Sequence, residues 1–362
     1  MGAPSQSSKN MAASLAVVGC SSAALAISFL GMAQFDLPIT KYVRSVTIHL
    51  PWDQLIVPWM AFTSDMGDWV GQGWRLATLS ILLLVVGWVF EKPPIKMVAI
   101  QSLIAHGLAA LLANGLKHLI GRPRPKFVHS GDWQMTLSWA SGLDSFPSGH
   151  STASFAVATV LSKRFPLFAP LCIPIALFVA LSRVLRGSHF PTDVLGGAVI
   201  GILTGFIAMN PLRQWRASMQ DGLRYAAMGA SAVFALLWVL SRRMEDGLAG
   251  ILFLALGAGA VAGGLWLRRT HWICRGQTGG GRRSTTSALL IAYGLAAMTT
   301  SPLVLASVGF ACMASWLDAI SRHDDPAETS PGRFLMLESA WLGGLAFAIL
   351  ILVDARGVLP FQ

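Results

Sequence analysis

Long apolar stretches separated by short polar segments recur along the whole 362-residue chain. A helix needs about 20 apolar residues to cross the hydrocarbon core of a bilayer. The first part of the chain offers six candidate spans, the fourth of them short. They comprise residues 11–35, 74–90, 95–119, 151–162, 167–185 and 194–209. The first stretch exceeds the roughly 7–15 apolar residues of a cleaved signal peptide, so we expect an uncleaved anchor there.

A polar break at residues 210–224, with Pro211 and several arginines, precedes a second group of five candidate spans. These comprise residues 225–240, 248–267, 285–300, 302–319 and 334–353. Pro302 is the expected turn between the third and fourth of them, because residues 285–319 are too many for one crossing. The pattern predicts an all-α, polytopic integral membrane protein with two domains, residues 1–212 and 213–362.

The composition supports this fold class. Charged residues make up 12% of the chain, against roughly 25% in an average soluble protein. This excludes a disordered chain and an ordinary soluble enzyme. The net charge of +10 fits the Lys and Arg excess of cytoplasmic loops. We expect no nucleic-acid partner, because aromatic and basic residues are not interleaved.

The distribution of basic residues predicts the topology. If the N-terminus is cytoplasmic, the basic groups at residues 92–96, 163–164 and 213–224 also face the cytoplasm, as the positive-inside rule requires. Three polar blocks, at residues 117–125, 146–150 and 182–193, fall on the opposite side. Because zero or two crossings separate them, we expect all three blocks to meet at the extracytoplasmic face.

The three blocks resemble the three signature motifs of the type 2 phosphatidic acid phosphatase superfamily. The matching residues stand in the family's order. They are Lys117, Arg124, Pro125; Pro147, Ser148, Gly149, His150; and Ser182, Arg183, His189, Asp193. The resemblance covers residues 12–210 and implies a six-helix lipid-phosphatase core, to which about five further transmembrane helices are added. Residues 213–362 resemble no family, and their function stays open.

Residue chemistry agrees with phosphate binding in these blocks. The cations Lys117, Arg124 and Arg183 suit the charge of a phosphomonoester, and Arg can bind phosphate through two parallel hydrogen bonds. Ser148 stands where the N-cap of the next helix belongs. Gly149 allows a ligand close to the backbone, and a helix N-terminus binds anions through its free N–H groups.

The remaining motif residues are candidate catalytic groups. Asp193 lies four residues after His189 and could accept a hydrogen bond from one ring nitrogen, leaving the other free to attack. The resemblance implies that His189 attacks phosphorus to form a phosphohistidine, and that His150 is the general acid and then the general base. No metal and no cofactor are implied. Arg122 and Arg186 match no fixed motif position, and contact with a headgroup is one open interpretation of them.

The expected function is hydrolysis of a lipid phosphate or diphosphate by a multi-pass enzyme of the cell (inner) membrane, with its site on the extracytoplasmic face. Undecaprenyl diphosphate, phosphatidic acid and phosphatidylglycerol phosphate all suit the family. One alternative is a phosphotransferase that passes the phosphoryl group to another lipid at the same site. Another is a non-catalytic lipid transporter or scaffold. The expected partners are the substrate lipid and the bilayer, and the oligomeric state stays open.

Overall fold

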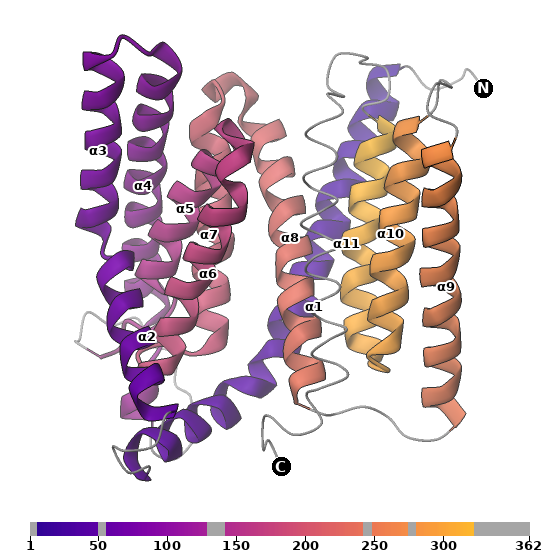
Figure 1. Cartoon of the computed structure of the whole chain (residues 1–362), viewed down its shortest axis with the longest axis horizontal. Helices are drawn as coiled ribbons and strands as arrows, with labels where there is room; N and C mark the ends of the chain where they lie inside the picture. Colours follow the sequence, from indigo (N-terminus) through magenta and orange to yellow (C-terminus); the bar gives the residue numbers. More distant parts are fainter. Residues whose placement is uncertain (1–5, 50–55, 129–141, 242–247, 274–279, 322–362) are drawn as a thin grey trace. The chain divides into compact units, whose positions relative to one another are not determined.

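The computed structural model describes residues 6–49, 56–128, 142–241, 248–273 and 280–321, and within these ranges all regular structure is helical (Figure 1). Ten of the predicted spans lie in helices, which confirms the all-α class. The eleventh, at residues 334–353, lies outside the described residues.

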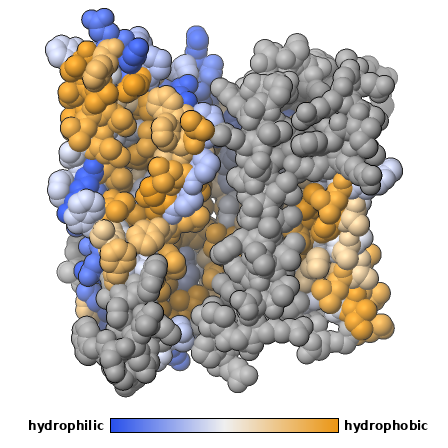
Figure 2. Space-filling view, in the orientation of Figure 1, coloured by the Kyte–Doolittle hydropathy of each residue, from blue (hydrophilic) through white to orange (hydrophobic). Residues whose placement is uncertain are grey.

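Seven of the described helices are long and apolar enough to cross a membrane, and an eighth span results if one bent helix pair is counted. Hydrophobic residues cover much of the described surface in the part of Figure 2 where α3 and α4 lie. Leu82, Trp88 and Leu111 are among the exposed apolar side chains of these two helices. Such side chains are stable there only against lipid or another protein. The chain is therefore a multi-pass membrane protein.

The chain forms two compact units, one of residues Met32–Ala226 and one of Met1–Gly31 with Ala227–Gln362. The unit boundaries fall inside the first and the eighth helix. The predicted functional domains, divided at residue 212, stay a prediction. The helices that contribute to the first unit are α1 (Gln6–His49), α2 (Ile56–Gly71), α3 (Gly73–Val89), α4 (Pro93–Ile120), α5 (Gly149–Arg164), α6 (Ala169–Leu185), α7 (Pro191–Met209) and α8 (Trp215–Leu240).

Helix α5 is the centre of the Met32–Ala226 unit. Its residues from Ser151 to Val160 are all buried, and α4, α6 and α7 pack around it. Helix α7 approaches α5 through glycines at four-residue spacing. A Cβ at Gly197 would meet the Ser148 carbonyl oxygen at 2.6 Å, and one at Gly201 would meet the Thr152 carbonyl oxygen at 2.5 Å. This small-residue packing fixes the N-terminal ends of α5 and α7 beside each other.

Three helices differ from the sequence prediction, one by its presence and two by a boundary. Helix α2 was not predicted; it forms with α3 a pair bent by 53° at Gln72. Helix α1 continues beyond residue 35 to His49, and α8 already begins at Trp215, inside the predicted break. Hydropathy missed these segments because they contain polar residues, and protein contacts bury only some of these. Asp36 in α1 and Ser218 in α8, for example, are both buried at 1% exposure.

The second unit contains α9 (Leu248–Ile273), α10 (Gly280–Met298) and α11 (Pro302–Ser321) with parts of α1 and α8. Helices α9 and α10 touch through backbone: a Cβ on Gly257 would lie 2.5 Å from the Gly294 carbonyl oxygen. The Ser307 hydroxyl lies 2.8 Å from that of Ser28 and 2.7 Å from that of Ser231. Glycine contacts and buried hydroxyls therefore contribute to the packing of this unit, beside buried apolar side chains such as Phe234 and Val304.

Candidate active site

Four helix ends bring the three polar blocks together at one end of the Met32–Ala226 unit. Helix α4 ends just after Lys117, and α6 ends just after Arg183. Helix α5 begins at Gly149, and α7 begins just after His189. Successive helices run in opposite directions, so the ends of α4 and α6 meet the starts of α5 and α7. The predicted common face of the three blocks is therefore present.

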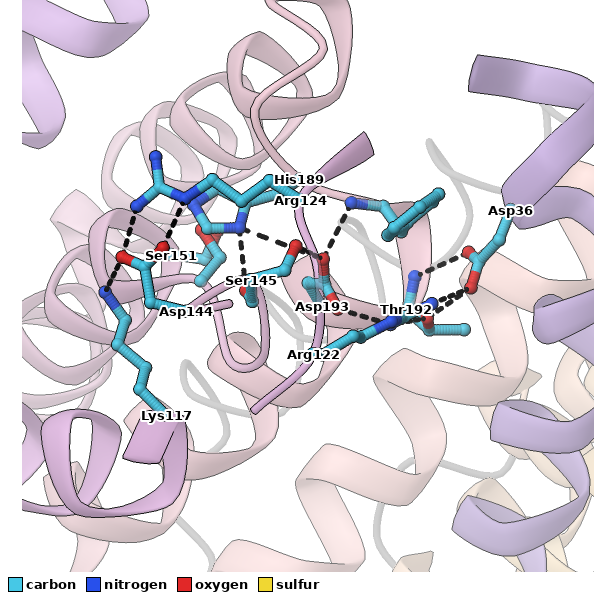
Figure 3. A network of polar contacts seen from close by, with 12 residues as sticks. Asp36, Lys117, Arg122, Arg124, Asp144, Ser145, Ser151, His189, Thr192 and Asp193 are labelled. Atoms are coloured by element: carbon cyan, nitrogen blue, oxygen red, sulfur yellow. Dashed lines mark hydrogen bonds and ion pairs between the residues drawn. The ribbon is translucent and has the colours of Figure 1, made fainter. Parts of the chain in front are cut away.

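The first two blocks meet at Lys117. Its Nζ lies 3.7 Å from the position that a Cβ of Gly149 would occupy, so the ammonium group lies beside the start of α5 at ordinary van der Waals distance. Both Lys117 and Arg124 face Asp144: the lysine Nζ is 3.9 Å from Oδ2, and Arg124 Nε donates to Oδ1 at 2.8 Å. Asp144 therefore lies among the phosphate-binding candidates, as Figure 3 shows.

Asp144 was not a predicted site residue, since no motif spacing marks it. Burial raises the pKa of its carboxyl, but the hydrogen bonds and charge of Arg124 and the charge of Lys117 outweigh burial and hold the pKa below its usual range. The carboxylate is consequently ionised at neutral pH. In this structure it occupies the hydrogen-bonding positions that a phosphate could use.

A second unpredicted carboxylate, Asp68 on α2, joins the second and third blocks. It pairs with Arg183, and its Oδ1 lies 3.3 Å from His150 Nε2. Helix α2 reaches α6 through Gly67, where a Cβ would lie 2.2 Å from the Ser182 Oγ. No sequence motif marks Asp68, because α2 is not among the predicted spans.

The surroundings of His150 disfavour its charged form. Burial lowers its pKa most, the charge of Arg183 adds to this effect, and the charge of Asp68 opposes it, which brings the pKa to about 4. His150 is therefore neutral at pH 7 in this structure. An opposite charge beside it, such as a bound phosphate, would raise this pKa.

Ser148 occupies the predicted N-cap position of α5, but its side chain does not cap the helix. Its hydroxyl instead accepts a hydrogen bond from Ser151 Oγ at 3.1 Å, and its N–H donates to the Asp193 carbonyl oxygen at 3.0 Å. The first N–H groups of any helix lack partners within the helix. Those that follow Ser148 can therefore bind an anion.

The His189 ring is oriented by an unpredicted acceptor. Its Nδ1 lies 2.8 Å from the Ser145 carbonyl oxygen and 3.8 Å from Asp193 Oδ2, so the expected hydrogen bond to Asp193 is replaced by one to Ser145 (Figure 3). A carbonyl oxygen only accepts, so Nδ1 carries the proton of the neutral ring. This leaves Nε2 with a free electron pair.

Asp193 is fully buried and caps α7. Its Oδ2 accepts hydrogen bonds from the Phe190 N–H at 2.8 Å and from the Ser145 hydroxyl, and its Oδ1 pairs with Arg122. Burial lowers the pKa of His189, and the nearby Asp193 opposes this effect. Asp193 therefore acts on His189 by charge at 3.8 Å and through their common partner Ser145.

Comparison with known proteins identifies the segment that carries this site. Residues 98–216 match the family model described as the PAP2 superfamily, which confirms the predicted resemblance. The chain is similar to a lipid A 1-phosphatase of Rhizobium etli, with 39% identity over 26% of this chain and 41% of the relative. It is also similar to the undecaprenyl-diphosphatase BcrC of Bacillus subtilis, with 33% identity over 35% of this chain and 64% of the relative.

The chain thus spans less than two thirds of either relative. Among solved structures, a transmembrane PAP2-type phosphatidylglycerolphosphate phosphatase from Bacillus subtilis is 28% identical, with 51% of this chain and 92% of that chain covered and a TM-score of 0.36.

Proposed function

We propose that this protein is a membrane lipid phosphatase that works through a phosphohistidine on His189. The observation that carries the proposal is the free Nε2 of a buried histidine whose charged neighbours include Asp193, Arg183 and Arg124. Phosphoryl transfer depends mainly on positioning and charge stabilisation. The matched PAP2 segment contains all of these residues, and both relatives named above are phosphatases by name.

Binding of the phosphoryl group uses the cations and the start of α5. Lys117, Arg124 and Arg183 bind the non-bridging oxygens, together with the N–H groups that follow Ser148 and the backbone left open at Gly149. The phosphate takes over hydrogen bonds that Arg124 and Arg183 donate to Asp144 and Asp68 in this structure. The lipid tail stays in the bilayer, so only the headgroup has to enter the polar end of the helix bundle.

In the first chemical step, Nε2 of His189 attacks phosphorus and the bond from phosphorus to the lipid oxygen breaks. His150, whose pKa the bound phosphate raises, gives its proton to that leaving oxygen. The His189 ring becomes a phosphorylated imidazolium that keeps its Nδ1 proton on the Ser145 carbonyl oxygen. The carboxylate of Asp193 stabilises this positive ring.

In the second step, water attacks phosphorus while His150, now neutral, accepts one of its protons. The P–N bond breaks, its electron pair returns to Nε2, and inorganic phosphate leaves. His189 is again neutral, and His150 holds the proton for the next cycle. Residues of this chain supply all the charge stabilisation in this scheme, so activity in the presence of a chelator is expected.

We further propose that the site faces the extracytoplasmic side of the cell (inner) membrane. Lys163 and Arg164 end α5 at the opposite end from His150, and Lys96 lies at the start of α4, opposite Lys117. Cations at the end away from the site agree with a cytoplasmic location of that end. The candidate substrates remain the lipid phosphates and diphosphates named above, and the matched relatives support this class.

The test is phosphate release from a panel of detergent-solubilised lipid phosphates with EDTA present. Wild type, His189→Ala and the control His118→Ala are compared, because His118 matches no motif position. We expect release by wild type and the control, and loss of about 10⁴-fold or more in His189→Ala. Equal release by wild type and His189→Ala would contradict the proposal. If no phosphate is released, transfer to an added acceptor lipid would indicate the phosphotransferase alternative.

A further inference from the structure

A buried chain of charges extends from His189 away from the phosphate-binding cations. Arg122 is the centre of this chain and is only 5% exposed. Its Nη1 donates to Asp193 Oδ1 and, at 2.7 Å, to Thr192 Oγ1, while its Nη2 donates to Asp36 Oδ2 at 2.8 Å. Figure 3 shows Arg122 beside Asp36 and Asp193, apart from Lys117 and Arg124. Arg122 therefore belongs to the interior of the unit, and the headgroup interpretation does not describe its contacts.

Asp36 lies at the far end of this row of buried charges, and its carboxylate is held by hydrogen bonds as Arg122 is. Its side chain is 2% exposed. It accepts hydrogen bonds from Arg122 Nη2, from the Thr192 N–H at 3.0 Å and from the Thr192 hydroxyl. Asp36 thus joins α1 to the first turn of α7, one residue before Asp193. Burial of an unpaired charge is costly. The three hydrogen-bond donors around the Asp36 carboxylate offset this cost.

The charges of Asp36, Arg122 and Asp193 do not sum to zero until His189 becomes positive. Asp36 and Asp193 contribute two negative charges and Arg122 one positive charge, which leaves one negative charge in the buried network. The phosphorylated imidazolium of the proposed mechanism supplies the missing positive charge. Without Asp36, Arg122 and Asp193 would neutralise each other, and no net charge would remain to stabilise that ring.

We propose that Asp36, acting through Arg122, is a positioning residue that supplies the net negative charge for the cationic form of His189. This inference rests on the proposed function, since the cationic ring is the phosphohistidine intermediate. Arg122 holds Asp193 in place, and Asp36 prevents Arg122 from cancelling the charge of Asp193. Asp36 itself touches no substrate atom in this scheme.

The proposal predicts opposite effects for its two charged members. Besides Asp36 and Arg122, the groups that act on His189 by charge include Asp193, Arg183, Arg124 and, from α5, His150. Removal of the Asp36 charge leaves these surroundings more positive, so the pKa of His189 falls further below 6.5. Removal of the Arg122 charge leaves them more negative, so the pKa rises. A merely structural role would not give shifts of opposite sign.

The experiment is a histidine-selective NMR titration of His189 in detergent, with kcat and KM measured in parallel. Wild type is compared with Asp36→Asn, Arg122→Gln and Thr192→Val. We expect Asp36→Asn to lower the pKa by about half a unit or more and Arg122→Gln to raise it. Thr192→Val removes a hydroxyl and no charge, so its pKa should stay at the wild-type value. We expect kcat of Asp36→Asn to fall about 10-fold or more while KM changes less than about threefold.

Conservative variants keep the test valid if Asp36→Asn does not fold. Asp36→Glu retains the charge and is expected to keep the wild-type pKa of His189, and Arg122→Lys should behave likewise. Equal pKa values in wild type, Asp36→Asn and Arg122→Gln, or shifts of the same sign in both variants, would overturn the proposal. The titration needs no substrate. An enzyme without phosphatase activity would therefore contradict the proposed function, and the pKa shifts would still decide the role of Asp36.

Discussion

The two units of this protein bury polar groups of different kinds. In the Met32–Ala226 unit the buried polar residues include the charged side chains Asp36, Arg122, Arg183 and Asp193. In the unit of Met1–Gly31 and Ala227–Gln362 the buried polar residues are mostly Ser and Thr, among them Ser28, Ser231 and Ser307, and Asp318 is the charged exception within the described ranges.

This difference indicates that the first unit carries out the chemistry and that the second mainly packs helices. A hydroxyl can satisfy its hydrogen bonds within a helix or with one neighbour, and such bonds contribute modestly to membrane-protein stability. A buried charge has to be paired and is functional more often than not inside a membrane. The first unit thus has the composition of a reaction centre, whereas the second has the composition of a packed helical scaffold.

The largest effect on activity is expected from the phosphate-binding cations of the Met32–Ala226 unit. Arg124→Ala should lower kcat/KM by about 10²–10³-fold, because it removes one charged donor to the transferred phosphoryl group. Arg124→Lys should recover part of this loss, since it keeps the charge without the planar fork. Phosphate release from the preferred lipid measures both. An Arg124→Ala protein with wild-type kcat/KM would remove this residue from the site.

The pH dependence of kcat/KM, which reports the free enzyme, tests the nucleophile. His189 has to be neutral to attack, and burial lowers its pKa below the usual 6.5. Activity should therefore persist above pH 6.5 and fall only as the pH drops through this lowered pKa, by about tenfold per pH unit below it. A profile measured from pH 4 to 8 checks the prediction. A flat profile, or a decline that begins above pH 6.5, would contradict a buried neutral histidine.

A smaller effect is expected from Asp68, which competes with phosphate for Arg183. Asp68→Asn should strengthen inhibition by inorganic phosphate about fivefold, as expected for an ion pair worth about 1 kcal/mol. The same variant should lower kcat, because His150 loses the charge that raises its pKa. Asp65→Asn is the matched control, because the Asp65 side chain is 80% exposed and lies 3.8 Å from Arg186. Equal inhibition constants in all three proteins would show that Asp68 does not compete.

The smallest effect on chemistry should come from the second unit. Gly257→Val places side-chain atoms against the Gly294 carbonyl oxygen and should destabilise the α9–α10 contact by about 1–3 kcal/mol. Gly259→Val in the same helix has no atom within 4 Å of the added Cβ, so its Tm should stay near that of wild type. Thermal unfolding in detergent and kcat per folded molecule are the measurements. A large loss of kcat in folded Gly257→Val would show that the second unit contributes to the chemistry.

Much of the fold was predictable because membrane insertion is decided locally. Ten of the predicted spans lie in helices, and seven of the described helices, or eight with the bent α2–α3 pair, are long and apolar enough to cross a membrane. Such a helix satisfies its own backbone hydrogen bonds in lipid. The prediction failed where protein contacts replace lipid contacts. Helix α2 packs its Gly67 against Ser182 of α6 and carries Asp68, a residue that hydropathy analysis counts against a span.

The candidate site was predictable only where its residues belong to short continuous motifs. Motif spacing identified Lys117, Arg124, His150, Arg183 and His189, because each block is short and continuous in sequence. The partners of these residues were missed. Asp144 lies 20 residues from Arg124, and Asp68 lies 115 residues from Arg183. No local pattern marks a carboxylate whose role depends on a cation so distant in the chain.

The sequence by itself determined that this is a helical membrane protein with three polar blocks at one end of its first helices. The length of an apolar segment and the spacing of motif residues are local properties, and neither depends on how the helices are arranged. Only the tertiary structure decided that the Ser145 carbonyl orients His189 and that Asp36, 156 residues before Thr192, completes the charge balance behind it. The physical reason is that a buried charge is stabilised by whichever groups folding brings within a few ångströms, and that distance is not encoded in separation along the chain.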